Sequence, residues 1–252
     1  MRNCHSERSE ESPERTYMKI RLDKFISSQT AYSRSEIKTL IKNKSVSVNG
    51  AAAKSSDIKI DTETDTVILG GREIRYREHV YYMLNKPQGV VSATEDREEK
   101  TVLDLLPEEM KRPGLFPAGR LDKDTTGLLI ITDDGGFAHR MLSPKKHVYK
   151  YYAAVLDKEP DENIKAAFAE GIVLSDGTLC APADILSIAS NTVTLRLKEG
   201  KYHQVKRMFA ALGCTVIALE RYRIGALTLD DSLKKGEIRE LTEPELALIF
   251  QE

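Results

Sequence analysis

The sequence contains few cysteines and no long apolar run. Its three cysteines, Cys4, Cys180 and Cys214, are far apart and odd in number, which argues against a disulfide framework or a structural zinc site. A run of about eighteen apolar residues, which a membrane-spanning helix requires, is absent. Residues 1–17 hold no apolar stretch and do not resemble a secretory signal. We therefore expect a protein of the reducing cytoplasm with no membrane partner.

The chain also lacks a marked net charge. Its 38 basic and 39 acidic residues leave a formal charge of −1, so the overall balance does not indicate a nucleic-acid ligand. Hydrophobic residues make up 40% of the 252 residues and charged residues 31%. This composition supports a folded core and excludes a mostly disordered chain. The length allows one large domain, or a small domain joined to a medium one.

Positive charge is concentrated in residues 19–59, where nine basic residues face three acidic ones. Such an asymmetry suggests a polyanionic partner. Within an expected helix, Arg34, Lys38 and Lys42 recur every four residues and so lie on one exposed face. A phosphate backbone along that face would turn their mutual repulsion into attraction, although a solvated basic face fits the pattern equally well.

Residues 20–60 are predicted to form a compact α/β unit. Apolar spacing indicates a short helix over residues 20–26, and the pair Ser33 and Glu36 has the capping-box pattern that starts a second helix. Residues 46–48 then alternate as a strand before an Asn-Gly turn.

This unit resembles the S4 RNA-binding domain found in several RNA-modifying enzymes. The resemblance covers residues 18–65 and is carried by the run RLDKFISSQTAYSRSEIKTLIKNKSVSVNG. It implies RNA binding, through Arg34, Lys38 and Lys42 among others, and no chemistry.

The most informative stretch is GRLDKDTTGLLIITDDG, residues 119–135. Pro and Gly residues break regular structure before it, and residues 128–132 form an apolar run suited to a buried strand. We therefore expect Asp122 and Asp124 on a loop that enters a core strand. Such a loop fixes a side chain and leaves it accessible.

Two known motifs match this stretch only in part. The acidic residues fall near the spacing of a calcium EF-hand loop, but Thr126 and Asp133 occupy positions that require Asp or Asn and Glu. The D-x-D-x-T pattern also matches the nucleophile motif of haloacid-dehalogenase-like phosphatases. In those enzymes the apolar strand precedes the first Asp, whereas here it follows. We predict no metal site.

The same stretch closely resembles the catalytic motif of the RsuA-type pseudouridine synthases. Four further segments match that family in order: YMLNKPQGVVSAT, KYYAAV, LKEGKYHQVKRMFAALG and ERYRIGALTL. With the S4 domain, the resemblance spans residues 18–252. It implies an α+β fold in which a small S4 domain precedes a pseudouridine-synthase catalytic domain with a mostly antiparallel sheet.

The resemblance also implies roles for three residues. Asp122 is the essential carboxylate beside the sugar, acting either by attack on C1′ or by assisting glycal formation. Tyr152 stacks on the flipped base and mediates proton transfer, and Lys206 pairs with Asp122 to keep it ionised. No cofactor is implied, and the sequence contains neither a P-loop nor a G-x-G-x-x-G pattern.

Further residues are expected to contact or position RNA. Arg120 would help to extrude the nucleotide, and His203 and Gln204 would support the pocket unless they are purely structural. The remaining expected phosphate contacts are Lys86, Arg140, Lys145, Lys146, Arg207, Arg221 and Arg223.

The motif segments are closer to the branch that modifies small-subunit ribosomal RNA than to the large-subunit branch. We therefore predict that the partner is small-subunit (16S) ribosomal RNA or an assembling small-subunit particle, bound by a monomer. One alternative is a large-subunit (23S) target. The other is a non-catalytic RNA-binding or assembly factor.

The expected domain organisation has four parts. A disordered tail covers residues 1–17, the S4 domain 18–65, a linker 66–78 and the catalytic domain 79–252, with Met18 as the functional start and Gly70-Gly71 as the hinge. In the catalytic domain, strands are expected at 81–84, 128–132, 151–155 and 192–197, and helices at 137–142, 163–170 and 202–212.

Overall fold

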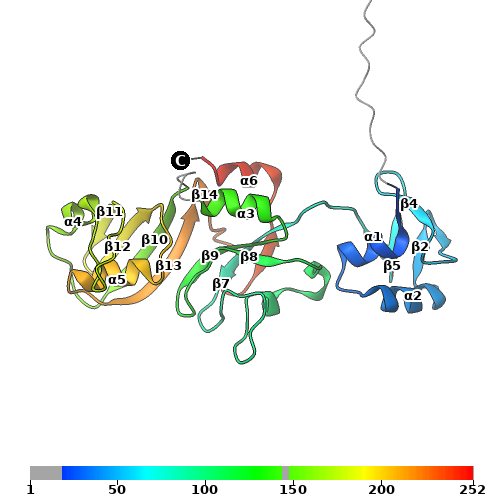
Figure 1. The fold of residues 1–252 in the computed structure, drawn as a ribbon, viewed down its shortest axis with the longest axis horizontal. Helices are drawn as coiled ribbons and strands as arrows, with labels where there is room; N and C mark the ends of the chain where they lie inside the picture. Colours follow the sequence, from blue (N-terminus) through cyan, green and yellow to red (C-terminus); the bar gives the residue numbers. More distant parts are fainter. Residues whose placement is uncertain (1–18, 144–147, 252) are drawn as a thin grey trace, which may run out of the picture. The chain divides into compact units, whose positions relative to one another are not determined.

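The computed structural model describes residues 19–143 and 148–251 (Figure 1). The chain forms two compact units, with the boundary between Arg77 and Glu78. The expected tail, Met18, Lys145 and Lys146 lie outside the described residues.

Two helices and a short strand pair open the first unit. Strand β1 (Lys19–Arg21) pairs antiparallel with β4 (Lys59–Asp61), and helices α1 (Leu22–Gln29) and α2 (Arg34–Lys42) follow β1 in the chain. The first helix begins at Leu22 rather than residue 20, because Ile20 belongs to the strand. The capping box that starts α2 is confirmed, since the Ser33 hydroxyl and the Glu36 carboxylate each accept a hydrogen bond from the other residue's backbone N–H.

A four-stranded antiparallel sheet completes the first unit, in the order β3-β2-β5-β6. Two of its strands lie within residues 66–78, so the segment expected as a linker is largely part of the fold. Gly70 and Gly71, with φ of +57° and +85°, form the tight turn between β5 and β6 and are not a hinge. The strands are β2 (Val46–Val48), β3 (Ala51–Ala52), β5 (Val67–Leu69) and β6 (Arg72–Ile74).

The second unit is built on a nine-stranded sheet whose main path runs β11-β12-β10-β13-β9-β7-β15 (Figure 1). Every strand pair in it is antiparallel except β13 with β9, which confirms the predicted α+β class. The strands are β7 (Tyr81–Lys86), β8 (Phe116–Ala118), β9 (Thr126–Thr132), β10 (Lys150–Leu156), β11 (Asp184–Ala189), β12 (Thr192–Leu197), β13 (Val216–Ile224), β14 (Leu227–Thr228) and β15 (Ile238–Glu240).

Helices cover this sheet through two apolar clusters. In the larger cluster, Phe168 of one helix contacts Phe209 of another, with ring centroids 5.0 Å apart. In the smaller cluster, Phe137 and Met141 pack with Ile249 near the carboxyl end. None of the described helices is long and apolar enough to cross a membrane. The helices are α3 (Gly135–Leu142), α4 (Ile164–Glu170), α5 (Gln204–Ala211) and α6 (Glu243–Leu248), with short 3-10 turns η1 (Leu103–Leu105) and η2 (Glu108–Met110).

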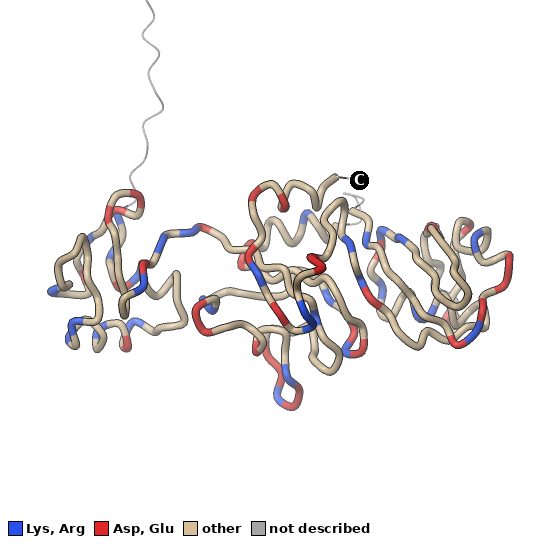
Figure 2. Tube along the Cα trace, turned by 180° about the vertical axis from the view of Figure 1, so that it is seen from behind, with Lys and Arg blue, Asp and Glu red and all other residues tan. Residues whose placement is uncertain are grey.

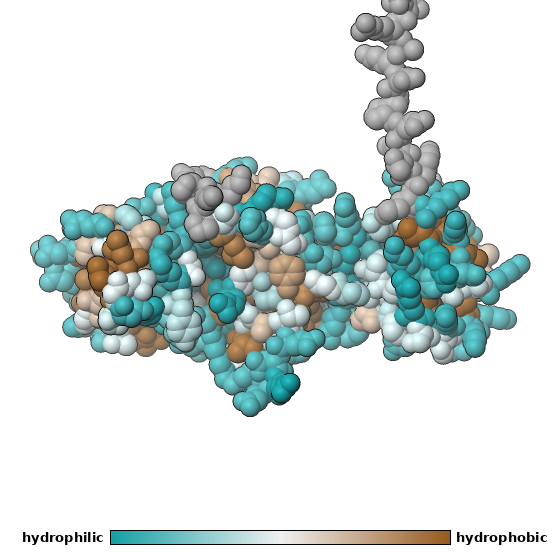
Figure 3. Space-filling model, in the orientation of Figure 1, coloured by the Kyte–Doolittle hydropathy of each residue, from teal (hydrophilic) through white to brown (hydrophobic). Residues whose placement is uncertain are grey.

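The outer strand β11 leaves apolar side chains at the surface. Leu186 and Ile188 are both exposed on this strand, which pairs on one side only, with β12. Figure 3 shows apolar surface over the lobe that contains β11 and β12.

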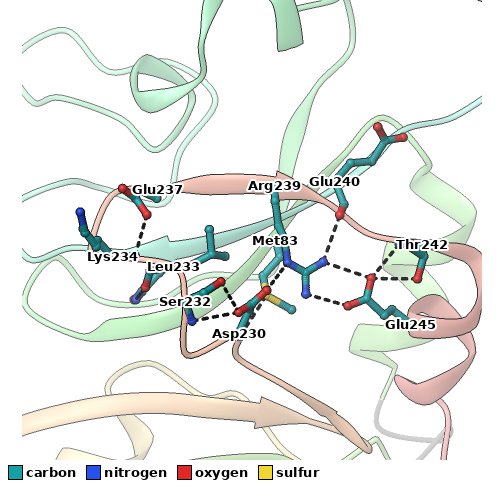
Figure 4. A network of polar contacts seen from close by, with 11 residues as sticks. Met83, Asp230, Ser232, Leu233, Lys234, Glu237, Arg239, Glu240, Thr242 and Glu245 are labelled. Carbon is teal, nitrogen blue, oxygen red and sulfur yellow. Dashed lines mark hydrogen bonds and ion pairs between the residues drawn. The ribbon is translucent and has the colours of Figure 1, made fainter.

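A polar network fastens the last strand and helix to the sheet (Figure 4). The Arg239 guanidinium on β15 donates to Asp230 at 2.6 Å and to the Glu245 carboxylate at 2.7 and 3.1 Å. Glu245 also accepts from the backbone N–H of Thr242 at 2.8 Å, which caps α6. The hydrogen bonds from Arg239 and Thr242 outweigh burial and lower the pKa of Glu245 to about 2. Because β15 pairs with β7, this network supports the strand that ends at Lys86.

Candidate active site

The loop between β8 and β9, residues 119–125, carries the predicted catalytic aspartate. Its first residue, Gly119, has φ of +92°, and a Cβ there would lie 2.9 Å from the side chain of Leu142. Ser92 fixes the next turn of the loop, because its hydroxyl donates to the Leu121 carbonyl at 2.8 Å and accepts from the Leu121 N–H at 3.1 Å. The two hydrogen bonds of Ser92 therefore fix the loop directly after Arg120.

The Lys86 side chain is fully buried beneath this loop. Its ammonium donates to the backbone carbonyls of Asp122 and Thr125, each at 3.0 Å, and to those of Pro87 at 3.1 Å and Lys123 at 3.3 Å. Burial lowers the pKa of Lys86 to about 8. The prediction that Lys86 contacts phosphate is wrong, because a side chain with no exposed surface cannot reach RNA. Lys86 instead anchors the loop that carries Asp122.

Asp122 lies within an ion-pair cluster at the edge of the cleft. Lys206 on α5 approaches Asp122 Oδ2 at 3.1 Å and Asp124 Oδ1 at 2.5 Å, and His203 Nε2 lies 3.5 Å from Asp122 Oδ1. The hydrogen bond from Lys206 lowers the pKa of Asp124. Burial opposes the charge on Lys206, but hydrogen bonds to the two aspartates outweigh it and raise its pKa. Lys206 therefore places a positive charge beside both aspartate carboxylates.

A cleft of about 300 Å³ opens beside this cluster and is lined by Arg120, Asp122 and His203, among others. An adjoining hollow of about 70 Å³ shares these three residues and extends to the ring of Tyr152 on β10. The Asp122 side chain is 24% exposed, so it is both fixed and open to a ligand. The structure therefore brings Asp122, Tyr152, Lys206, Arg120 and His203 together, as predicted.

Two other predicted residues form contacts within the protein. Gln204 is buried, donates to the Glu199 carboxylate at 2.8 Å and accepts from the Lys201 N–H at 2.9 Å, so its amide fixes the turn before α5. Arg207 pairs with Asp176 at 2.6 Å. Gln204 also lines the smaller hollow, where its internally bonded amide forms part of the wall.

Two further arginines predicted to bind phosphate are also engaged internally. Arg221 is buried, and its Nε donates to the Leu128 carbonyl at 2.9 Å, so its predicted phosphate contact is wrong. The Arg223 guanidinium lies 4.3 Å from the centroid of the Tyr151 ring and donates to the Gly225 carbonyl. Arg140 remains exposed at the surface of α3.

The basic residues of the first unit are placed as predicted. Arg34, Lys38 and Lys42 are all exposed along α2, whose charged positions are visible in Figure 2. Among the described residues, none of the three has an acidic partner within ion-pair distance. This helix therefore offers three uncompensated cations to a phosphate backbone.

Two residues lining the cleft were missed in the sequence. Thr125 is buried next to Tyr152, and its hydroxyl has no hydrogen-bond partner among the described residues. Its position in the run DKDTTG, close to Asp122 and Asp124, could have identified it from the sequence. Tyr202 lines the cleft of about 300 Å³, and its position beside His203 in the run KYHQ could have identified it from the sequence. No group of three or more acidic, His or Cys residues in the described part of the chain could hold a metal.

Comparison with known sequences agrees with this geometry. Residues 80–211 match the RNA pseudouridylate synthase family, and residues 20–67 match the S4 domain. The chain is 44% identical to the uncharacterized RNA pseudouridine synthase YtzG of Bacillus subtilis, over 91% of this chain and 98% of that protein. It is 42% identical to the ribosomal small subunit pseudouridine synthase A of Escherichia coli K12, over 91% of this chain and all of that one.

A solved structure described as a pseudouridylate synthase superposes with a TM-score of 0.64, at 41% identity, and covers 91% of this chain and 99% of that chain. The family match includes the loop of residues 119–125, Tyr152 and Lys206, and the S4 match includes α2. The chain therefore belongs to the RNA pseudouridylate synthase family and joins an S4 RNA-binding domain to an isomerase domain.

Proposed function

We propose that this protein converts a specific uridine of small-subunit ribosomal RNA to pseudouridine, with Asp122 as the essential carboxylate and without a cofactor. The observation that carries this proposal is the placement of Asp122 on an anchored loop, between Lys206 and the hollow that reaches Tyr152. The small-subunit target is supported by relatives named ribosomal small subunit pseudouridine synthase A, at 42% and 44% identity.

The chemistry requires an ionised carboxylate at the sugar. Pseudouridine formation breaks the N1–C1′ bond of uridine, rotates the detached uracil and joins its C5 to C1′. Asp122 provides this carboxylate, either by attack on C1′ or by assisting glycal formation, and the Lys206 ammonium 3.1 Å away places a positive charge beside it. Because every atom of the uridine is retained and its oxidation state is unchanged, the reaction needs no redox partner and no energy source.

The target uracil must leave the base stack of the RNA before it can rotate. Removing a base from a helix costs a few kcal/mol. The exposed cations of α2 and Arg120 offset that cost by contacting phosphates. The Tyr152 ring then stacks on the extruded uracil, and its hydroxyl transfers protons during the isomerisation.

Site-resolved pseudouridine mapping of ribosomal RNA tests this proposal. Cells lacking the gene are complemented with the wild type, with Asp122→Asn, or with Asp124→Asn as a matched change on the same loop. We expect one small-subunit position to lose its mark, and expect the wild type and Asp124→Asn to restore it while Asp122→Asn does not. The Asp122→Asn protein should bind ribosomal RNA within about threefold of the wild-type affinity, because its contribution is made in the transition state.

Other outcomes would point elsewhere. A lost mark in large-subunit RNA would overturn the small-subunit target and leave the isomerase assignment intact. No lost mark at all would favour a binding or assembly factor. Restoration by Asp122→Asn would remove this residue from the mechanism.

We also propose that the protein acts as a cytoplasmic monomer. The three widely spaced cysteines, two of which are free and buried, suit a reducing compartment. Light scattering of the purified protein tests the oligomeric state, and a mass of twice 28.3 kDa would contradict a monomer.

A further inference from the structure

Tyr202 has an unusual position for a large aromatic residue. Its side chain is 73% exposed, the highest value among the exposed large hydrophobic residues of the described chain. It lies at the cleft that also contains Arg120 and Asp122. An uncovered ring beside a polar cleft suits a ligand with a flat apolar face and polar edges.

One face of the Tyr202 ring is already stacked. The Tyr202 and His203 ring centroids are 3.8 Å apart, with an angle of 19° between the rings. His203 in turn reaches Asp122, since its Nε2 lies 3.5 Å from Oδ1. The two rings therefore form a short stack that begins at the catalytic carboxylate, and the large exposed surface of Tyr202 lies at its outer end.

The turn that carries this stack is fixed by the protein. His203 has φ of +47°, a left-handed conformation that non-glycine residues seldom adopt, at the start of α5. Gln204 and Glu199 hold the turn through the hydrogen bonds described above, and Lys201 pairs with Glu199 at 2.5 Å. Backbone strain of this kind clusters at ligand sites and persists only where its surroundings enforce it. The rings are thus ordered before a ligand arrives.

We propose that Tyr202 and His203 form a stacking platform for an unpaired base that neighbours the target uridine in the RNA. This inference rests on the proposed function. The base lies flat on the outer face of Tyr202 and extends the stack, while the target uridine enters the hollow at Asp122 and Tyr152. Arg120, exposed in the same cleft, is available to the phosphate near them. Because every base has a π-face, the platform tolerates different sequences at that position.

Steady-state kinetics with a small-subunit ribosomal RNA transcript test the platform. Tyr202→Ala and Tyr202→Leu both remove the aromatic face, and Leu keeps apolar bulk. We expect KM to rise about 5- to 150-fold in both, the range that base–aromatic stacking energies imply. We expect kcat to change less than about twofold, because the platform binds ground state and transition state alike. Tyr202→Phe keeps the ring and should recover most of the lost affinity.

A matched control lies outside the cleft. Ile217 on β13 is 64% exposed and does not line either hollow, so Ile217→Ala removes a comparably exposed apolar side chain without touching the platform. Thermal unfolding of all variants confirms that they fold. If Tyr202→Ala alone is unfolded, Tyr202→Leu decides the result.

A spectroscopic measurement reports the stack directly. The fluorescent base 2-aminopurine is placed beside the mapped uridine, and its quenching is followed on binding to Asp122→Asn protein with either Tyr or Ala at position 202. Quenching that requires Tyr202 supports the platform. If the wild type modifies the transcript but Tyr202→Ala and Tyr202→Leu keep the wild-type KM and quenching, the platform is overturned. If the wild type modifies no uridine, it is the proposed function that fails.

Discussion

Replacing Lys86 with methionine should loosen the loop of residues 119–125, which carries Asp122, and should remove no contact with RNA. Methionine has a similar length and preserves the apolar stem, but it removes the ammonium that reaches four backbone carbonyls at 3.0–3.3 Å. Two of those carbonyls belong to Asp122 and Thr125. The loss should therefore displace Asp122, the proposed essential carboxylate, more than any other residue of the site.

The size of the effect follows from two opposing contributions. The Lys86 ammonium has three N–H groups, so it makes three hydrogen bonds at a time to the four carbonyls, and each contributes about 1.5–3 kcal/mol. Burying the charge opposes them: the pKa of Lys86 falls from 10.5 to about 8 through burial, which corresponds to roughly 3 kcal/mol. The difference leaves a net loss of about 1–6 kcal/mol for Lys86→Met. With a central value of about 3 kcal/mol, a unit of this size should lose about 6–12 °C in Tm.

Circular dichroism melting combined with steady-state kinetics measures both consequences. We expect kcat to fall at least about tenfold, while KM for the transcript changes less than about threefold, because only the reacting carboxylate is displaced. Lys123→Met is the control, since Lys123 lies on the same loop, is half exposed and pairs with Glu99 at the surface. It should shift Tm by less than about 2 °C. A Lys86→Met protein with wild-type Tm and kcat but a raised KM would refute the reasoning and return Lys86 to the RNA-contacting residues.

Two further predictions concern charge. In the first, Arg34, Lys38 and Lys42 are all changed to glutamine. The steepness of the plot of log affinity for the ribosomal RNA transcript against log salt concentration should fall by about 2, because each lost phosphate contact removes about 0.7–0.9. An unchanged slope would contradict the role of α2. The carboxylate of Glu245 titrates near pH 2 in the folded state and near 4.5 when unfolded, so its contribution to stability is complete above about pH 4.5 and is lost as the pH falls towards 2. In Arg239→Met we expect a lower Tm at pH 7, and we expect at least about half of this acid dependence of stability to disappear. Thermal unfolding of the wild type and Arg239→Met from pH 7 to 2.5 measures both effects. An identical pH profile in the two proteins would refute the coupling of Glu245 to Arg239.

Local signals in the sequence predicted several elements closely. The alternating run at residues 192–197 forms β12 with the same bounds, and the Ser33–Glu36 pattern caps α2 as expected. These succeeded because strand alternation and capping chemistry depend on neighbouring residues alone. Resemblance to the family correctly placed Lys206 beside Asp122, although 83 positions intervene in the sequence.

Burial of charge could not be predicted in the same way. Lys86 and Arg221 look like phosphate-binding residues in the sequence, and both are buried with backbone carbonyls as partners. Their environment depends on loops and strands distant in the chain, so composition and spacing carry no sign of it. The prediction that Gly70-Gly71 is a hinge is wrong because two successive glycines fit more than one structure. Paired glycines also suit a tight hairpin turn, and only the pairing of β5 with β6 distinguishes the two.

The parallel pairing of β9 with β13 has a consequence for when the enzyme becomes active. Gly127 approaches the Arg221 backbone so closely that a Cβ would lie 2.3 Å from its carbonyl oxygen, and the Arg221 side chain is bonded to Leu128, 93 positions earlier in the chain. At a translation rate of about 5–20 residues per second, β9 waits roughly 5–20 s for its partner. Until then the Thr126–Gly127 end of β9, next to the loop of Asp122, lacks its pairing with β13, although β7 and β8 already pair with the rest of the strand. Contacts this distant in the chain also form late in folding. The first unit ends at Arg77, so a nascent chain can complete the S4 unit well before β13 exists to complete the sheet of the isomerase domain.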